Sequence, residues 1–309
     1  MNKKVVAIIA VALIILTAIV VVIMRNVRSG SGNTAEISNR SAKDDTAEGL
    51  AIITSGKDGD FINSFCAITD KTPDASEYEK KATSLAKAYE KQNRLDKAQG
   101  LYQKIIDKLP NSQNIASIQN ALDSIHIKLI FAADPTPDSV IYEVQKGDSL
   151  YKIAKKFNTT IELLTRSNSL KNDKLHIGKK LKITNLKFGI VVDKSQNTLV
   201  LKSGDTIIKT YRVSTGKNFC TPVGTFKVVN RIENPTWYTA GAVVPADSPK
   251  NILGTRWLGL SAKGYGIHGT TEPESIGKNA TAGCVRMKNE EVEELYILIP
   301  EGTEVTIID

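Results

Sequence analysis

"GYGIHGTTEPESIGKNATAGCVRM", residues 264–287, carries a histidine and a cysteine sixteen positions apart, with turn-forming residues around both. Cysteine catalysis needs a thiolate, whose usual pKa of about 8.5 must be lowered or bypassed by a neighbouring base, and donors for an oxyanion. Cys284 follows Gly283, which permits a turn that exposes the thiol. His268 is the last of only three histidines in the chain. We therefore expect Cys284 to be a nucleophile and His268 its base.

Three neighbours complete this candidate site. Arg286 lies two residues beyond Cys284, so an extended backbone places both side chains on one face, where Arg286 favours a thiolate or holds a substrate carboxylate. The backbone amides of Gly283 and Cys284 are the expected oxyanion donors. Thr281 is expected to hydrogen-bond the imidazole and fix its tautomer.

The sequence on both sides of the stretch alternates with period two. "KFGIVVDKSQNTLVLKSGDTIIKTYRVSTG", residues 187–216, alternates apolar and polar side chains around two turns, and "TPVGTFKVVNRI" and "EVTIID" continue the pattern. This is typical of antiparallel strands. Only "NEEVEELYILI", residues 289–299, favours a helix. We predict a mostly-β, sandwich-like domain over residues 187–309.

A smaller unit precedes it at residues 140–185. "IYEVQKGDSLYKIAKKFNTTIELLTRSNSLKNDKLHIGKKLKI" begins and ends with strand-like runs and carries two helical patterns between them, which predicts the order βααβ. Residues 140–186 hold ten Lys or Arg against four Asp or Glu, a net charge of +6. Such a basic face suits nucleic acid, an anionic wall or plain solvation, so charge alone decides nothing.

Residues 46–132 are expected to be helical. "EYEKKATSLAKAYEKQNRLDKAQGLYQKIIDKLP", residues 77–110, has the spacing of two amphipathic helices that pack as a hairpin. Residues 133–139, "ADPTPDS", contain two prolines and are predicted to be a linker.

The N-terminus predicts a membrane anchor. Residues 5–24, "VVAIIAVALIILTAIVVVIM", are twenty uncharged residues, about 30 Å long as a helix, which is enough to span a bilayer. A cleaved signal peptide is the alternative, but the run is long for one and no small-residue cleavage pattern precedes Arg25. We predict a transmembrane signal anchor at residues 1–25 and a flexible linker at 26–45.

The cysteines exclude a disulfide framework, because the chain has only Cys66, Cys220 and Cys284. Whether Cys66 and Cys220 pair is left open, and a disulfide between Cys220 and Cys284 would silence the nucleophile. A zinc site built from Cys220, His268 and Cys284 would lack a close ligand pair. We expect neither a metal nor a cofactor.

Three segments resemble known families. Residues 187–309 resemble the L,D-transpeptidase catalytic domain of the YkuD-like family, through "STGKNFCTPVGTFKVVNRIENPTWY", "ILGTRWLGLS", "YGIHGTTEPESIGKNATAGCVRM" and "PEGTEVTII" in family order. Residues 140–185 resemble a LysM module through "YEVQKGDSLYKIAKKFNTT", "LLTRSNSL" and "LHIGKKLKI". Residues 77–110 are similar to the tetratricopeptide repeat register.

The first resemblance implies that Cys284 attacks the carbonyl of the third residue of a peptidoglycan tetrapeptide stem and expels the terminal D-alanine. His268 would take the thiol proton, and Gly283 would belong to the oxyanion turn. The amine of another stem would then form a cross-link between two third residues, whereas water as acceptor would give L,D-carboxypeptidase action. Ala282 stands where many relatives have histidine, which leaves His268 as the only base.

The resemblances also imply binding residues. The substrate-binding candidates are Gly269, Thr270, Tyr265 and Trp257. The LysM resemblance implies an N-acetylglucosamine-containing glycan in a groove formed by Gly147, Asp148, Ser149, Leu150, Asn168 and Leu170. Gly147 and Asp148 are also compatible with a plain role in starting a helix.

Rival functions fit less well. A sortase would place its histidine far upstream of a Thr-Leu-x-Thr-Cys run, which is missing here, and papain-like hydrolases have cysteine before histidine. A non-catalytic wall-binding scaffold is the alternative of another class.

The resemblance places the chain after the anchor on the extracytoplasmic side of a single-pass membrane protein. Peptidoglycan is the expected partner, with a protein partner for the helical region, no nucleic acid, and a LysM module that acts independently of the catalytic domain.

Overall fold

The computed structural model describes residues 45–239 and 241–309, which form two compact units that meet in sequence at Leu129 and Ile130. Each unit is described by itself. The predicted anchor at residues 1–25 lies outside the described residues, as does all but the end of the linker. None of the helices within residues 45–239 and 241–309 has the length and apolar content that crossing a bilayer requires.

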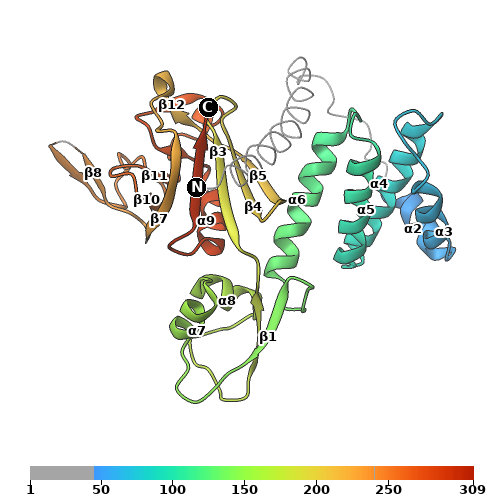
Figure 1. Ribbon diagram of the computed structural model, residues 1–309, viewed down its shortest axis with the longest axis horizontal. Coiled ribbons are helices and arrows are strands. Elements are labelled where there is room, and N and C mark those ends of the chain that lie inside the picture. Colours follow the sequence, from blue (N-terminus) through green and yellow to red (C-terminus); the bar gives the residue numbers. More distant parts are fainter. Residues whose placement is uncertain (1–44, 240) are drawn as a thin grey trace, which may run out of the picture. The chain divides into compact units, whose positions relative to one another are not determined.

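The N-terminal unit is helical, in blue and green in Figure 1. Its elements are α2 (Ala47–Thr54), α3 (Asp58–Phe65), α4 (Ala75–Lys91), α5 (Leu95–Lys108) and most of α6 (Ile115–Phe131). Helices α4 and α5 pack together, and the buried hydroxyl of Tyr102 donates to Glu90 at 2.9 Å. The predicted hairpin of residues 77–110 is confirmed, whereas its tetratricopeptide character stays a prediction.

The predicted βααβ order of the LysM-like segment is confirmed. Strand β1 (Ser139–Glu143) pairs antiparallel with β2 (Lys180–Thr184), and α7 (Leu150–Phe157) and α8 (Ile161–Ser167) lie between them in the chain. Ser149 and Thr160 cap the two helices by accepting the amides of Lys152 and Leu163. The core is formed by Val144, Leu150, Ile153, Ala154, Leu164, Leu181 and Ile183.

The remainder of the second unit is built on one eight-stranded sheet in the order β13-β11-β10-β7-β14-β3-β4-β5. In chain order its strands are β3 (Phe188–Asp193), β4 (Thr198–Ser203), β5 (Thr206–Arg212), β7 (Gly224–Glu233), β10 (Arg256–Leu260), β11 (Gly266–His268), β13 (Val285–Arg286) and β14 (Glu304–Ile308). Two small ribbons pair β6 (Thr215–Gly216) with β12 (Asn279–Thr281) and β8 (Trp237–Thr239) with β9 (Ala242–Val244).

The sheet bends and nearly closes on itself, so the domain is β-rich as expected, with one curved sheet. The first part of β7 pairs with β14 and its second part with β10, so β7 belongs to both halves of the sheet. At the far ends, Ser214, just after β5, exchanges two backbone hydrogen bonds of 2.8 Å with Arg286 of β13. The start of β13 therefore lies where the two ends of the sheet meet.

The predicted helix in residues 289–299 is α9 (Asn289–Leu298), and it contacts the LysM-like module. The hydroxyl of the buried Thr160, the N-cap of α8, donates to the carbonyl of Ile297. Arg231 of β7 pairs with Glu162 of α8 at 3.2 Å and donates to the carbonyl of Tyr296 at 2.7 Å. The two modules share an interface, and the expectation that they act independently stays a prediction.

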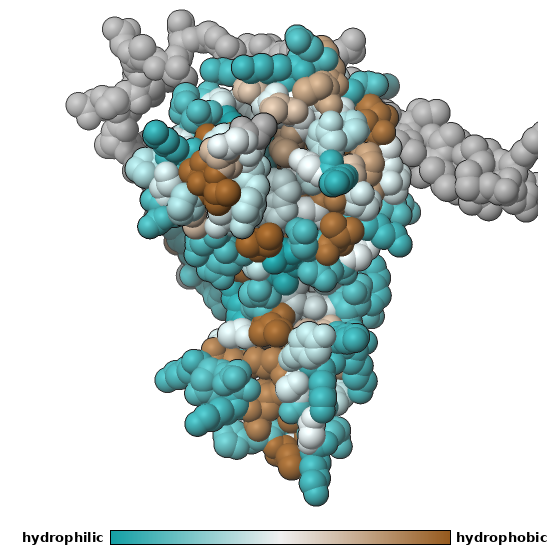
Figure 2. All heavy atoms as spheres, turned by 90° about the vertical axis from the view of Figure 1, so that its left-hand side faces the viewer, coloured by the Kyte–Doolittle hydropathy of each residue, from teal (hydrophilic) through white to brown (hydrophobic). Residues whose placement is uncertain are grey.

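Exposed apolar side chains are scattered over the second unit. They include Val140, Ile141, Tyr151, Ile161, Ile177, Phe219, Val223, Val229, Ile232, Tyr238 and Val243. On the face drawn in Figure 2, separate brown patches lie among teal side chains, without one continuous apolar surface.

Candidate active site

Three adjacent strands place the candidate residues on one face of the sheet. Trp257 of β10 pairs directly with His268 of β11, and His268 pairs with Arg286 of β13. Paired residues of neighbouring strands project to the same side, and so do residues two apart along a strand. Cys284 directly precedes β13, and its thiol lies beside Gly264 and the Gly266 backbone, at the start of the strand that carries His268.

Cys284 lies on a turn that hydrogen bonds from Thr281 stabilise. The Thr281 hydroxyl donates to the Cys284 carbonyl at 2.7 Å and accepts the Gly283 amide at 3.1 Å. Gly283 has a φ of 129°, and an added Cβ would lie 2.6 Å from the Tyr265 ring, so only glycine fits. The thiol is partly exposed and lies 3.7 Å from the Gly264 carbonyl.

These bonds correct two expectations. Thr281 binds the turn and not the imidazole, because a hydroxyl that already serves two backbone groups of residues 283–284 is committed there. The Gly283 amide is likewise used by Thr281, which leaves the amide of Cys284 as the oxyanion donor of the pair.

His268 is buried, and its tautomer follows from its partner. Nδ1 lies 2.7 Å from the Gly269 carbonyl; since a carbonyl only accepts, Nδ1 carries the proton and Nε2 is left as the basic nitrogen. Burial lowers the pKa of His268 to about 4, and the nearby Arg286 charge acts in the same direction. The imidazole is thus neutral near pH 7.

The thiol is also neutral at rest. Burial raises the pKa of Cys284, while the Gly266 backbone and the Arg286 charge partly oppose this shift. A neutral thiol beside a neutral imidazole suits proton transfer during attack, in place of a preformed thiolate–imidazolium pair.

Arg286 is buried and already paired. Its Nη1 lies 2.6 Å from a Glu272 carboxylate oxygen and 3.0 Å from the Ser275 hydroxyl. A guanidinium held in this way acts on the thiol through its charge, and the expected role in binding a substrate carboxylate stays a prediction.

The four substrate-binding candidates divide into two kinds. Tyr265 lines the Cys284 turn, and Trp257 stacks on His268 with ring centroids 5.9 Å apart. Gly269 and Thr270 are buried, and both backbone polar groups of Thr270 bond to Asn289. These two residues hold the loop after β11, which differs from the expected contact with substrate.

Cys220 lies beside the turn but forms no disulfide. All three cysteines are free, and Cys220 and Cys66 are exposed. The space next to Gly216 is filled by the Cys220 sulfur and the Gly283 backbone, which places Cys220 close to the Cys284 turn. Within residues 45–239 and 241–309, no group of His, Cys, Asp or Glu has an arrangement that could hold a metal ion.

The LysM candidates fall into residues of the turn before α7 and residues that pack or bond within the module. Gly147 and Ser149 are exposed at the turn before α7, and Asp148 accepts from the Tyr142 hydroxyl and the Gln145 amide at 2.8 Å each. Leu150 and Leu170 pack in the core. The Asn168 amide bonds both backbone groups of Lys182, so it fastens α8 to β2 and is not free for a glycan.

Two contributors were missed by sequence reasoning. Asn289 at the start of α9 bonds the backbone of Thr255 and Thr270; the repeated Gly-Thr pairs at 254–255 and 269–270 were the available signal. Tyr151 follows the Ser149 turn of the LysM-like module and is 65% exposed, which makes it a further candidate for contact with a sugar ring.

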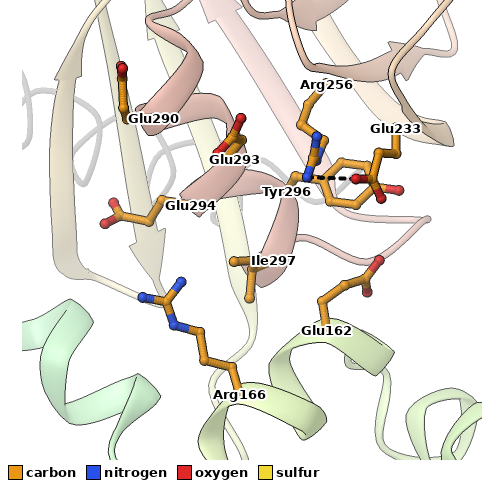
Figure 3. A pocket seen from close by; sticks show the side chains of 9 residues that line it. All are labelled: Glu162, Arg166, Glu233, Arg256, Glu290, Glu293, Glu294, Tyr296 and Ile297. Atoms are coloured by element: carbon orange, nitrogen blue, oxygen red, sulfur yellow. Dashed lines mark ion pairs between the residues drawn. The ribbon is translucent and has the colours of Figure 1, made fainter. Parts of the chain in front are cut away.

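A separate pocket lies between α8 and α9 (Figure 3). Glu162, Arg166, Glu233, Arg256, Glu290, Glu293, Glu294, Tyr296 and Ile297 line it, and none of these is a candidate catalytic residue. Glu233 pairs with Arg256 at 3.0 Å, and Glu294 pairs outside the pocket lining with Lys209 at 2.6 Å.

A partly exposed thiol on a turn beside β11, with a buried neutral imidazole and a guanidinium on the adjoining strands, suits nucleophilic cysteine chemistry. Comparison with known proteins agrees with that class: the L,D-transpeptidase catalytic domain model of the YkuD family matches residues 187–307, and the LysM domain model matches residues 142–184.

Relatives match over the same region. YkuD of Bacillus licheniformis, which carries a provisional L,D-transpeptidase name, is 36% identical over 176 residues, which are 54% of this chain and 98% of the relative. YqjB of Bacillus subtilis, named in the same way, is 43% identical over 126 residues, 39% of this chain and 70% of the relative. The solved catalytic domain of an E. faecium L,D-transpeptidase is 23% identical to this chain, with a TM-score of 0.33. The match covers 39% of this chain and 96% of the solved domain. The chain belongs to the YkuD family of L,D-transpeptidases.

Proposed function

We propose that this protein is a cell-wall L,D-transpeptidase that uses Cys284 as its nucleophile. The observation that carries the proposal is the Cys284 thiol on a turn beside the start of β11, the strand that carries His268, with the His268 Nδ1 proton held by the Gly269 carbonyl. This leaves Nε2 as the nitrogen that can take the thiol proton.

The reaction follows in two halves. In the first, the Cys284 sulfur forms a bond to the carbonyl carbon of the third stem residue while its proton passes to His268. The bond to the terminal D-alanine breaks, and His268 returns the proton to the departing amine. The Cys284 amide stabilises the oxyanion, and the Arg286 charge stabilises the sulfur as negative charge develops on it.

In the second half an acceptor amine attacks the thioester, loses its proton to His268 and regenerates the thiol. A side-chain amine of another stem gives the cross-link, and water gives L,D-carboxypeptidase action. The family supports the first acceptor.

The rest of the chain is proposed to hold the enzyme at the wall. The basic LysM module supports glycan binding through the exposed turn at residues 147–149, joined by Tyr151. The apolar run at residues 5–24 supports a single-pass anchor with the catalytic part on the extracytoplasmic side. The helical unit is proposed to bind a protein partner, since helical hairpins of this kind present extended surfaces.

The test incubates the full chain in detergent with a disaccharide-tetrapeptide and follows released D-alanine and intact protein mass. We expect Cys284-dependent release, an acyl adduct and a cross-linked dimer, all abolished in Cys284→Ala. Release without dimer would identify a carboxypeptidase. No release and no adduct from a folded, reduced protein would favour the non-catalytic wall-binding scaffold.

A further inference from the structure

Asn289, the first residue of α9, uses its whole side-chain amide to join two backbone segments. Its Oδ1 accepts the amides of Thr270 at 3.0 Å and Thr255 at 3.3 Å, and its Nδ2 donates to the Thr270 carbonyl at 2.9 Å. This orientation of the amide places Oδ1 toward the two backbone N–H donors and Nδ2 toward the Thr270 carbonyl, which is an acceptor. Asn289 therefore fixes the segment before β10 to the segment after β11.

A glycine on each segment leaves space for the Asn289 side chain. A Cβ added to Gly254 or to Gly269 would collide with Asn289 Oδ1. Gly254 also has a φ of +64°, which side chains rarely adopt. Each glycine precedes one of the threonines that Asn289 binds, so the two Gly-Thr pairs and Asn289 interlock.

The segments that Asn289 joins carry the carbonyls that face His268. The Gly269 carbonyl accepts from His268 Nδ1 at 2.7 Å. The Leu253 backbone also raises the pKa of this imidazole, whereas burial and the Arg286 charge lower it. Leu253 directly precedes Gly254, and Gly269 directly precedes Thr270. Movement of the segment after β11 would move the Gly269 carbonyl, which is the acceptor that selects the tautomer of His268.

We propose that Asn289 is a positioning residue for His268: it holds the Gly269 carbonyl so that the proton stays on Nδ1 and Nε2 remains the base. Asn289 touches neither substrate nor the reacting atoms. This proposal rests on the proposed function in that it gives the tautomer a catalytic use, although the tautomer itself can be observed without activity.

The test replaces Asn289 by Ala in the full chain and reads the His268 ring by ¹⁵N NMR near pH 7. The chain has three histidines, so the His268 signals are assigned by their loss in His268→Gln. We expect wild type to show the Nδ1–H tautomer and Asn289→Ala to lose it in part or entirely. On the tetrapeptide donor, kcat for D-alanine release should fall about tenfold or more, within the range that one general base contributes, while KM changes little.

Leu298→Ala is the matched control, because Leu298 is a fully buried residue at the other end of the same helix and makes none of these bonds. It should lower stability while the His268 tautomer and kcat are retained. If Asn289→Ala does not fold, Asn289→Asp replaces the donor to the Thr270 carbonyl by an acceptor that repels it, so the Nδ1–H fraction must fall there too.

An unchanged Nδ1–H tautomer in a folded Asn289 variant would overturn the proposal, as would an equal kcat loss in Leu298→Ala. If wild type releases no D-alanine, the proposed function fails, and the NMR result still decides the role of Asn289.

Discussion

Trp257 stacks on His268, with ring centroids 5.9 Å apart and ring planes inclined by 19°. The two residues are direct partners across β10 and β11. The indole nitrogen donates to Asn230 at 3.1 Å, and a side chain on Gly266 would overlap the indole ring, so the ring lies flat over that glycine. One face of the catalytic imidazole is therefore covered by an aromatic ring.

This stack predicts that Trp257→Leu impairs proton transfer. Aromatic pairs contribute about 0.5–1.5 kcal/mol beyond burial, and a ring that carries positive charge during the reaction gains from an aromatic face. We expect kcat for D-alanine release to fall about three- to tenfold, with Trp257→Phe retaining most of it. Equal losses in both variants would show that the indole hydrogen bond matters more than the stack.

The buried His268 predicts a loss of stability in mild acid. The unfolded chain protonates this imidazole below its usual pKa of 6.5, whereas the folded chain keeps it neutral down to about 4. The free energy of unfolding is therefore fully present above pH 6.5 and decreases as pH falls toward 4, by about 3 kcal/mol from this group.

Urea unfolding followed by tryptophan fluorescence measures this, because both tryptophans lie in the catalytic domain. His268→Gln should remove that part of the pH dependence. An undiminished pH dependence in His268→Gln would assign the effect to other groups.

Gly283→Ala should disable the turn that presents Cys284. The positive φ and the contact with the Tyr265 ring both oppose a side chain, with strain of about 1–3 kcal/mol from the backbone alone. Gly302→Ala is the control, since Gly302 has a φ of +89° with open space around it. We expect D-alanine release to fall at least about tenfold only in Gly283→Ala; similar activity in the two variants would contradict the assigned geometry.

Thr160→Val tests the interface between the LysM module and α9. The valine removes the α8 cap and leaves the partly buried Ile297 carbonyl without its donor, a combined cost of about 2 kcal/mol or more. Ser149→Ala removes only the comparable cap of α7. Calorimetry should show a larger drop in Tm for Thr160→Val; equal drops would mean that the Ile297 contact contributes nothing.

Local signals explain what could be predicted. The period-two strands of residues 187–216, the βααβ order and the helix at residues 289–298 are each specified by side chains close together in the chain, and all were recovered. The placement of the Cys284 turn beside the strand of His268 followed from the motif only in part. Their register depends on the parallel pairing of β11 with β13, which no local pattern reveals.

The sequence by itself determined the helical, βααβ and mostly-β segments and the family, and it predicted the nucleophile–base pair, because periodicity, turn chemistry and a distinctive motif are local properties. Tertiary structure alone decided which group binds which. It engaged Thr281 with the turn, paired Arg286 with Glu272, and brought Asn289 to the His268 loop and Thr160 to α9. The physical reason is that a buried polar group must satisfy its hydrogen bonds with whatever the fold brings within about 3 Å, and those partners are distant in sequence.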